Sequence, residues 1–142
     1  MRALLDVNVL VAFFDEEHVH FERARQWWAA NQGDGWASCP LTQNGVIRVM
    51  SQSSYANPIL VSQAFELLAV QIAETDHAFW SDDISLLDSS RFDREQIRGP
   101  GQLTDAYLLA LAVKNSGRLA TLDRSIPIAA AQGAEARHLV VI

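Results

Sequence analysis

Three aspartates lie where an apolar segment of the chain ends or begins. Asp6 directly follows the apolar run at the N-terminus, and Asp123 directly follows the apolar residues 119–122. Asp105 lies near the start of a long apolar segment. Burying a carboxylate beside such segments is costly unless a cation or several hydrogen-bond donors offset the charge. Mg²⁺ and Mn²⁺ prefer oxygen ligands and keep several waters, so a few carboxylates from separate elements suffice. The three aspartates together therefore suggest a divalent-metal site.

A divalent metal held by carboxylates can hydrolyse a phosphodiester without help from other reactive side chains. The ion lowers the pKa of its bound water, orients the phosphodiester and stabilises the leaving oxygen. The sequence fits this chemistry, because its four histidines show no HExxH spacing and it contains neither GxSxG nor a Walker A pattern. A hydrolytic site built from acids and metal is therefore the leading hypothesis.

Each of these residues also has a purely structural interpretation. Asp6 can cap the helix that follows it, and Asp105 can complement the dipole in the first turn of its own helix. Asp123 can be a turn residue. Asn8 can bond its own backbone or orient a metal ligand as an outer partner. The metal hypothesis fails only if these structural roles account for all three aspartates at once.

The periodicity of apolar residues predicts the elements that must position these acids. Short apolar or β-prone runs predict strands at residues 2–5, 36–39, 77–80, 118–122 and 140–142. Helical spacing predicts helices at residues 7–14, 18–31, 40–50, 61–73 and 103–115, with one more short helical turn within 82–90.

Strands that alternate with helices predict an α/β fold with a central parallel sheet of about five short strands flanked by helices. No repeat or linker divides the chain, so residues 1–142 are predicted to form a single domain. Ligand sites in such sheets lie beyond the carboxyl ends of the strands. Asp6 and Asp123 both follow a predicted strand, which strengthens the site hypothesis.

The composition limits the class of protein and its surroundings. With 49% hydrophobic and 20% charged residues, the chain is globular rather than disordered. A net charge of −6 argues against a broad basic face for nucleic acid, although a local arginine patch is compatible with it. The lone Cys39 excludes an internal disulfide and favours a reducing compartment. No apolar run approaches the ~20 residues of a membrane span, and no signal peptide is evident, so we expect a cytoplasmic protein.

Four segments carry a family resemblance. They are residues 5–10 (LDVNVL), 42–48 (TQNGVIR), 103–108 (LTDAYL) and 121–124 (TLDR). In this order and nearly end to end, the chain resembles the PIN-domain ribonucleases, and among them the VapC-type toxins of bacterial toxin–antitoxin pairs. No single motif is very specific, but the ordered set of four is.

The resemblance implies a PIN-like fold and a Mg²⁺- or Mn²⁺-dependent endoribonuclease. Such an enzyme cuts structured RNA, such as a transfer RNA or a ribosomal RNA loop, and leaves 5′-phosphate and 3′-hydroxyl ends. It also implies a homodimer held inactive by a cognate antitoxin, whose C-terminal segment lies over the acidic site. By the same matching, Asp6, Asp105 and Asp123 take the metal-binding positions and Asn8 the adjacent polar position.

One position departs from the family pattern, which commonly has a glutamate where this chain has Gln43. An amide oxygen can touch a metal but is a poor general base. We therefore expect weaker metal binding, or a second metal that binds only with substrate. Asp82 and Asp83 can compensate, or can be surface and capping residues. Alternatively, Gln43 marks a catalytically weakened module that binds RNA or antitoxin without cleavage.

Basic and aromatic residues offer further contacts to RNA. Arg48 matches the arginine of the family's N-G-x-x-R pattern and is expected to help position the phosphate. Arg91, Arg94 and Arg98 share one face if their segment is helical, and otherwise lie on a solvated loop. The four tryptophans fit core or dimer packing better than base stacking, because they fall in amphipathic or strand-like segments.

Phosphoryl transfer to an aspartate is a third hypothesis, since receiver domains and haloacid-dehalogenase-like phosphatases also place aspartates at strand ends. Those proteins need a lysine near the site. Lys114 is the only lysine, and it lies some two and a half turns along the helix from Asp105 at ~3.6 residues per turn. The D-x-D start of the phosphatases is also absent, because position 8 is Asn8. This hypothesis is therefore the weakest of the three.

Overall fold

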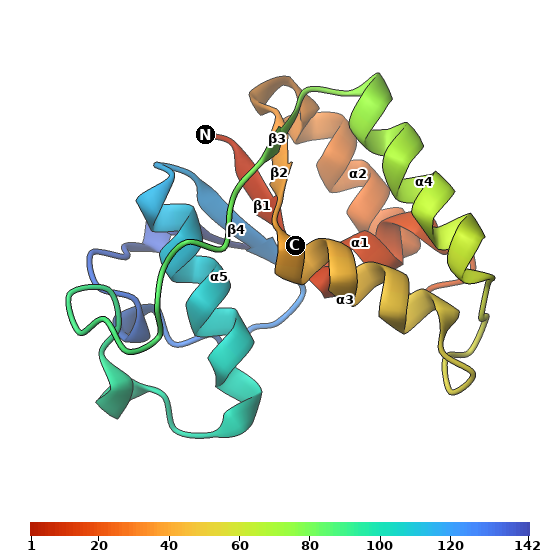
Figure 1. The fold of residues 1–142 in the computed structure, drawn as a ribbon. Coiled ribbons are helices and arrows are strands. Elements are labelled where there is room, and N and C mark those ends of the chain that lie inside the picture. The colour runs from red at the N-terminus through yellow and green to blue at the C-terminus, as the bar shows by residue number, and fades with distance from the viewer.

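The computed structural model describes all residues from 1 to 142. Its five strands form one sheet in the order β3-β2-β1-β4-β5, and every neighbouring pair is parallel (Figure 1). The strands are β1 (Ala3–Leu5), β2 (Trp36–Ser38), β3 (His77–Phe79), β4 (Arg118–Thr121) and β5 (Leu139–Val141). The predicted α/β class and all five short strands are confirmed.

Five α-helices flank this sheet. They are α1 (Val7–Phe14), α2 (Phe21–Asn31), α3 (Pro40–Ser51), α4 (Val61–Glu74) and α5 (Leu103–Lys114). In Figure 1, α5 lies apart from the other four helices, which gather on the opposite side of the sheet. Contacts between α1 and α2, α1 and α3, and α3 and α4 hold that group together.

The core has two parts because successive strand residues point to opposite faces of the sheet. On one face, Leu4 packs in the same cluster as Leu108 of α5. On the other face, Leu5 packs with Leu10 of α1 and Val46 of α3. Helix α5 is buried from residue 106 to residue 112, as its nearly continuous apolar sequence predicts.

The close packing of α3 on α1 depends on Gly45. A methyl group added at Gly45 would lie well inside van der Waals contact of Cγ2 of Val7. Val7 is the first residue of α1 and follows Asp6 directly. Gly45 therefore sets how closely α3 approaches the segment that carries one of the predicted site acids.

Two local predictions differ from the structure, and one alternative that the sequence left open is decided. Helix α2 begins at Phe21 rather than His18, because residues 15–20 form turns closed by bonds such as His18 N–H to the Asp15 carbonyl. Residues 82–90 contain no helical turn; they have turns at 86–87 and 89–90, with bonds such as Asp88 N–H to the Ser85 carbonyl. Arg91, Arg94 and Arg98 share no helix face, since only the short 3₁₀ segment 94–96 interrupts that loop.

The tryptophans belong to the core or pack against it. Trp36 and Trp80 are buried, and Trp27 and Trp28 of α2 pack against the cluster on the α1 side of the sheet. The expectation of packing over base stacking is confirmed for these rings within the chain. No helix of the structure has the length and apolar character needed to cross a bilayer.

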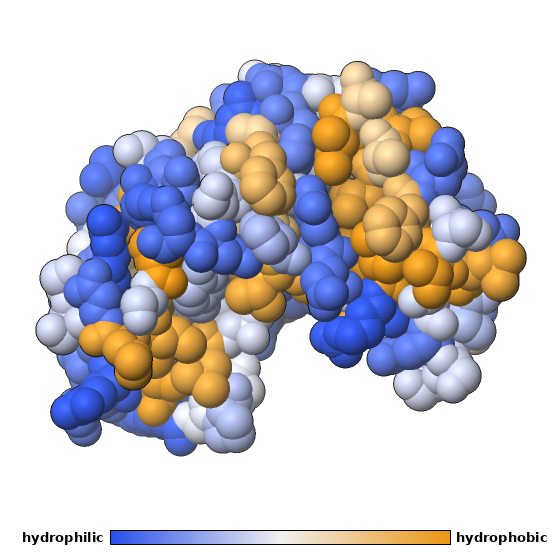
Figure 2. Space-filling model, viewed as in Figure 1, coloured by the Kyte–Doolittle hydropathy of each residue, from blue (hydrophilic) through white to orange (hydrophobic).

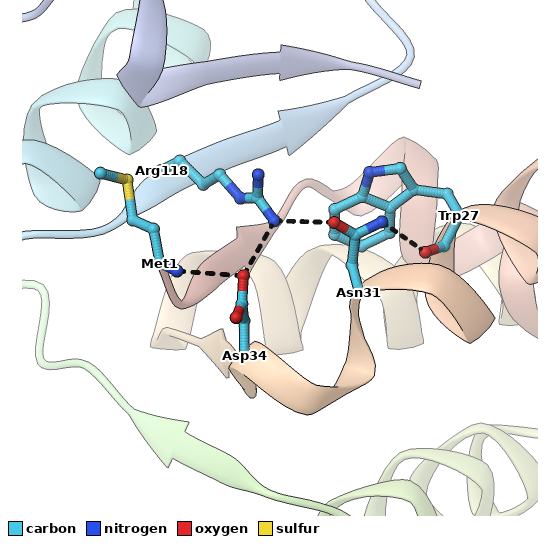
Figure 3. Close-up of polar contacts among 5 residues, drawn as sticks. All are labelled: Met1, Trp27, Asn31, Asp34 and Arg118. Atoms are coloured by element: carbon cyan, nitrogen blue, oxygen red, sulfur yellow. Dashed lines mark hydrogen bonds and ion pairs between the residues drawn. The ribbon is translucent and has the colours of Figure 1, made fainter.

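A polar network fixes the amino end of the sheet, away from the predicted site (Figure 3). Arg118, at the start of β4, donates to Oδ1 of Asn31 at 2.9 Å and lies 3.5 Å from Asp34. The N-terminal ammonium of Met1 lies 3.0 Å from the same Asp34 carboxylate, and Asn31 donates to the Trp27 carbonyl at 2.7 Å. The network ties β1 and β4 to the end of α2.

Candidate active site

The carboxyl ends of β1 and β4 form the crevice in which the site lies. These two strands are direct neighbours, with Leu5 opposite Ala120. The chain adds β2 and β3 on one side of the pair and β5 on the other, so the strand order reverses between β1 and β4. Ligands in open α/β sheets bind at this switch point. Asp6 directly follows β1, and Asp123 lies two residues beyond the end of β4.

Asp6 is only 5% exposed, and both of its carboxylate oxygens accept hydrogen bonds. Oδ1 accepts from the Val7 backbone N–H at 2.7 Å, so the residue also caps α1. Oδ2 accepts from the Thr121 hydroxyl at 2.7 Å. Burial raises the pKa of Asp6 above its ordinary value, and the Asp123 charge adds to this, while the bonds from Thr121 and Val7 oppose it.

Thr121 links Asp6, Asn8 and the backbone of Asp123 by hydrogen bonds, although no role was predicted for it from the sequence. Its fully buried hydroxyl donates to Asp6 and accepts from Nδ2 of Asn8 at 3.2 Å and from the Asp123 backbone N–H at 3.0 Å. This uses all the capacity of a hydroxyl, which has one proton and two lone pairs. Asn8 also accepts from the Leu122 N–H at 3.1 Å. The only signal in the sequence was its place in the TLDR segment.

Asp105 comes from the first turn of α5, across from the strand ends. Burial, together with the charges of Asp6 and Asp123, raises its pKa to about 6. The three acids are therefore close enough to repel one another. A bound cation reverses this preference and favours the ionised forms.

Asp123 is the acid that stays ionised most readily. Its Oδ1 accepts from both the backbone N–H and the hydroxyl of Ser125, each at 2.7 Å, and these bonds lower its pKa. This is the turn bonding expected of a purely structural residue. The site thus holds one acid with a depressed pKa beside two with raised values, which is an asymmetric arrangement typical of functional sites.

A pocket of about 370 Å³ opens over Asp6 and Asp105, and Asp123 does not line it. Its lining consists of Asp6, Val7, Asn8, Val11, His18, Val49, Tyr55 and Asp105. Two acids and an asparagine thus face the pocket. His18 and Tyr55 were not predicted as site residues, because the histidines do not show HExxH spacing and Tyr55 lies in none of the four family segments.

The donor set fits Mg²⁺ or Mn²⁺, because all the acids offer oxygen and their repulsion favours a cation. As placed, however, no three Asp, Glu, His or Cys side chains lie close enough together to hold one ion. Asp6 is tied to Thr121 and Val7, and Asp123 to Ser125. A shared ion would therefore need either rotation of these side chains or bridging waters, which Mg²⁺ commonly retains.

Gln43 and Arg48 lie elsewhere on the surface. Gln43 donates its amide to the Ser38 hydroxyl at 2.9 Å, and that hydroxyl also bonds Nε2 of His77 at 2.8 Å. Gln43 and exposed Arg48 line a separate pocket of about 540 Å³ between α3 and α4. The structure does not bring them into the pocket of Asp6 and Asp105, and their roles stay predictions.

Asp82 and Asp83 have structural partners, so the idea that they compensate for Gln43 gains no support. Oδ2 of Asp82 accepts from the Leu41 N–H at 3.0 Å in the first turn of α3. Asp83 forms an ion pair with Lys114. Because Lys114 is engaged in this ion pair, it is not free to serve as the lysine that a phosphoryl-transfer site needs.

Comparison with known proteins agrees with this architecture. The PIN domain family matches residues 3–132. Ribonuclease VapC44 of Mycobacterium tuberculosis is 51% identical over 142 residues, covering all of both chains. Ribonuclease VapC39 of the same organism is 37% identical over 138 residues, covering 94% of this chain and 96% of its own.

A solved structure shows the same fold at low sequence identity. VapC20 of Mycobacterium tuberculosis, a toxin that cleaves the sarcin–ricin loop, aligns with a TM-score of 0.59 over 82% of this chain and 85% of its own. Its sequence identity is 11%, so this likeness concerns the fold alone. The sheet order, the site at the switch point and the full-length relatives agree: the chain belongs to the PIN-domain family, in its VapC-type ribonuclease branch.

Proposed function

We propose that the chain, as a single domain over residues 1–142, is a Mg²⁺- or Mn²⁺-dependent endoribonuclease and the toxin of a toxin–antitoxin pair. The observation that carries the proposal is the placement of Asp6 and Asp105 on one pocket at the switch point of the sheet, with Asp123 just beyond the end of the neighbouring strand β4. Full-length relatives that are ribonucleases support RNA as the substrate. The reaction is attack of water on an RNA phosphodiester.

The three aspartates would hold the metal, and the metal when bound supplies an activated water and a charge that stabilises the leaving oxygen. The protein's own residues do the positioning. Thr121 joins the segments that follow β1 and β4 by bonding Asp6 and the Asp123 backbone, and Asn8 donates to the Thr121 hydroxyl. Without a cation, Asp105 is the acid that most readily takes a proton, because burial and its neighbours' charges raise its pKa to about 6.

Exposed Arg48 is proposed to contact the RNA phosphate backbone from α3, beside the site rather than within it. Arginine suits this role because its guanidinium carries a permanent charge and a planar set of donors. If Arg48→Ala kept full cleavage and unchanged RNA binding, this assignment would be wrong.

A cognate antitoxin and a second copy of the chain are the proposed protein partners, in the cytoplasm. The net charge of −6 fits a partner with a basic segment. Apolar surface over α4, visible in Figure 2, includes the exposed side chains of Leu60, Val61, Phe65 and Val70. Contiguous exposed apolar surface of this kind commonly marks a protein contact.

A second candidate keeps the fold without cleavage. Gln43, in place of the usual glutamate, favours a weakened module that binds RNA or antitoxin only. The two are separated by incubating the purified protein with total RNA and Mn²⁺, with chelator and Asp105→Asn as controls. The proposal expects cleavage that both controls abolish. RNA left intact by the wild-type protein, yet still bound, would favour the second candidate.

A further inference from the structure

His18 and Tyr55 form a rim on the pocket that also contains Asp6 and Asp105. The rim residues come from two connections that are distant in sequence, the turn after α1 and the segment between α3 and α4. Both side chains are half-buried, so each presents part of its ring to solvent. Neither residue has a part in the proposed hydrolysis.

Tyr55 is held by its hydroxyl and by the packing of its side chain against the core cluster, and it also lines the pocket. The hydroxyl donates to Oδ2 of Asp15, the residue that ends α1. Asn57 donates to the same oxygen at 3.5 Å, and the other oxygen accepts from the Glu17 N–H at 3.0 Å. Burial and the Asp15 carboxylate raise the pKa of Tyr55, so the hydroxyl stays protonated and engaged. The ring therefore has a fixed orientation at the pocket.

His18 is anchored in a similar way by the backbone. Its Nδ1 accepts the His20 backbone N–H at 3.0 Å. A neutral imidazole that accepts at Nδ1 carries its proton on Nε2, which is the end of the ring left free. The His20 ring lies 5.7 Å away between centroids, tilted by 45°, and supports the His18 ring from one side.

The remaining pocket wall is apolar, since Val7, Val11 and Val49 join the two rings. The acids repel a phosphate until a cation is present, so RNA needs a contact in the pocket that does not depend on charge. Bases supply that contact, because every base has a π-face that stacks on aromatic rings whatever its sequence. A pocket of about 370 Å³ has room for one base and none for a paired helix.

We propose that His18 and Tyr55 hold one unpaired base of the RNA beside the scissile phosphate. This inference rests on the proposed ribonuclease function and names the feature of the substrate that this pocket selects. The base stacks against the two rings, and its own phosphate then lies toward Asp6 and Asp105. His18 and Tyr55 are positioning residues, and they select an unstacked nucleotide rather than a particular base.

The test uses a synthetic hairpin RNA whose loop contains the site that the protein cuts in total RNA. Two further hairpins lack only the base on the 5′ or the 3′ side of the scissile bond. The variants are His18→Ala and Tyr55→Ala, with His18→Phe and Tyr55→Phe as ring-keeping counterparts. Phe79→Ala, which removes an exposed aromatic ring on β3 away from the pocket, is the matched control.

The alanine variants are expected to raise KM about tenfold with little change in kcat, as loss of one stacked base implies, while both phenylalanine variants stay within about threefold of wild type. One of the two abasic hairpins should show the same loss with the wild-type protein. On that hairpin, His18→Ala and Tyr55→Ala should cause no further loss, because the base they contact is already gone.

Several outcomes would overturn the inference while leaving the ribonuclease intact. These are unchanged cleavage by both alanine variants, equal cleavage of both abasic hairpins, or independent losses from the variant and the missing base. The phenylalanine variants keep the rings but lose the bonds to Asp15 and His20, so an equal loss in these variants would assign the effect to those bonds and contradict stacking as its source. By contrast, a wild-type protein that cuts no RNA with Mn²⁺ would refute the proposed function itself.

Discussion

At the scale of single residues, the hydroxyl of Thr121 connects two of the three acids that were predicted from the sequence. It bonds Asp6, Asn8 and the backbone of Asp123 at once. A buried carboxylate needs such partners, because a charge without them is strongly disfavoured in the protein interior. Thr121 is thus the link between packing at the end of β4 and the chemistry of the crevice.

Replacing Thr121 by valine tests this link. The substitution keeps the shape but leaves Asp6 Oδ2 and Asn8 Nδ2 without a buried partner, which typically costs about 1–3 kcal/mol of unfolding free energy. We expect that loss in urea denaturation, together with weaker Mn²⁺ binding by calorimetry. Thr121→Ser restores the hydroxyl and should recover most of both. Equal defects in the serine and valine variants would show that the hydroxyl is not responsible.

Removing the charge of Asp105 should stabilise the metal-free protein. The folded-state pKa of about 6 lies above the ordinary 3.8, so the protein is destabilised as pH rises from the lower value through the higher one. Asp105→Asn is therefore expected to raise the Tm in chelator more at pH 7.5 than at pH 5, and to abolish stabilisation by Mn²⁺. A Tm gain that did not grow with pH would contradict the coupling of the acids.

At the scale of elements, the site depends on how α1, α3, β1 and β4 approach one another. Gly45 lets α3 pack directly on Val7, the first residue of α1. Since Asp6 immediately precedes Val7, an error in the packing of the two helices displaces a site carboxylate. Gly45, the glycine of the N-G-x-x-R segment, is therefore needed for helix packing, independently of any contact with RNA.

Gly45→Ala should destabilise the protein although alanine favours helix. Overpacking typically costs about 1–3 kcal/mol, against a gain of up to about 1 kcal/mol in helix propensity. Gly33→Ala is the matched control, because a methyl group there meets nothing within 4 Å. Thermal unfolding should show a loss at position 45 only. The added change Val7→Ala should recover part of it, and absence of any recovery would place the clash elsewhere.

The pattern of elements could be predicted from sequence, whereas the contacts that complete the site could not. The five strands and α5 follow from short apolar runs separated by polar turns, which are local signals. The hydrogen bond between Thr121 and Asp6 joins residues 115 positions apart in the sequence, and the bond between Tyr55 and Asp15 joins residues 40 positions apart. No periodicity reports such pairs, so Thr121, Tyr55 and His18 were missed, and the attachment of Gln43 to Ser38 was not foreseen.

At the scale of the whole molecule, charge limits how the protein can bind RNA. The net charge is −6, and the arginines of residues 91–98 lie on a loop rather than on one face. The proposed RNA binding must therefore rely on few phosphate contacts, and on the proposed metal and pocket for the rest. This differs from a nucleic-acid-binding protein with a broad basic face, whose affinity depends steeply on salt.

The dependence of RNA binding on salt should accordingly be shallow. For single-stranded RNA the slope of log K against log salt is about −0.7 for each phosphate neutralised, so we expect a value between about −0.7 and −2. Fluorescence anisotropy with Asp105→Asn and a hairpin RNA measures this without cleavage. Arg48→Ala should reduce the slope by about 0.7. A slope steeper than about −4 would indicate an extensive basic surface that the fold does not present.

The most direct measurement is a crystal structure of the protein with Mn²⁺, with anomalous scattering recorded at the manganese edge. The predicted result is an ion in the crevice between β1 and α5, bound by Asp6, Asp105 and Asp123 directly or through waters, with the Asp105 carboxylate turned toward it. Manganese bound elsewhere, or held by only one of the three aspartates, would contradict the shared metal site and the hydrolytic chemistry proposed for it.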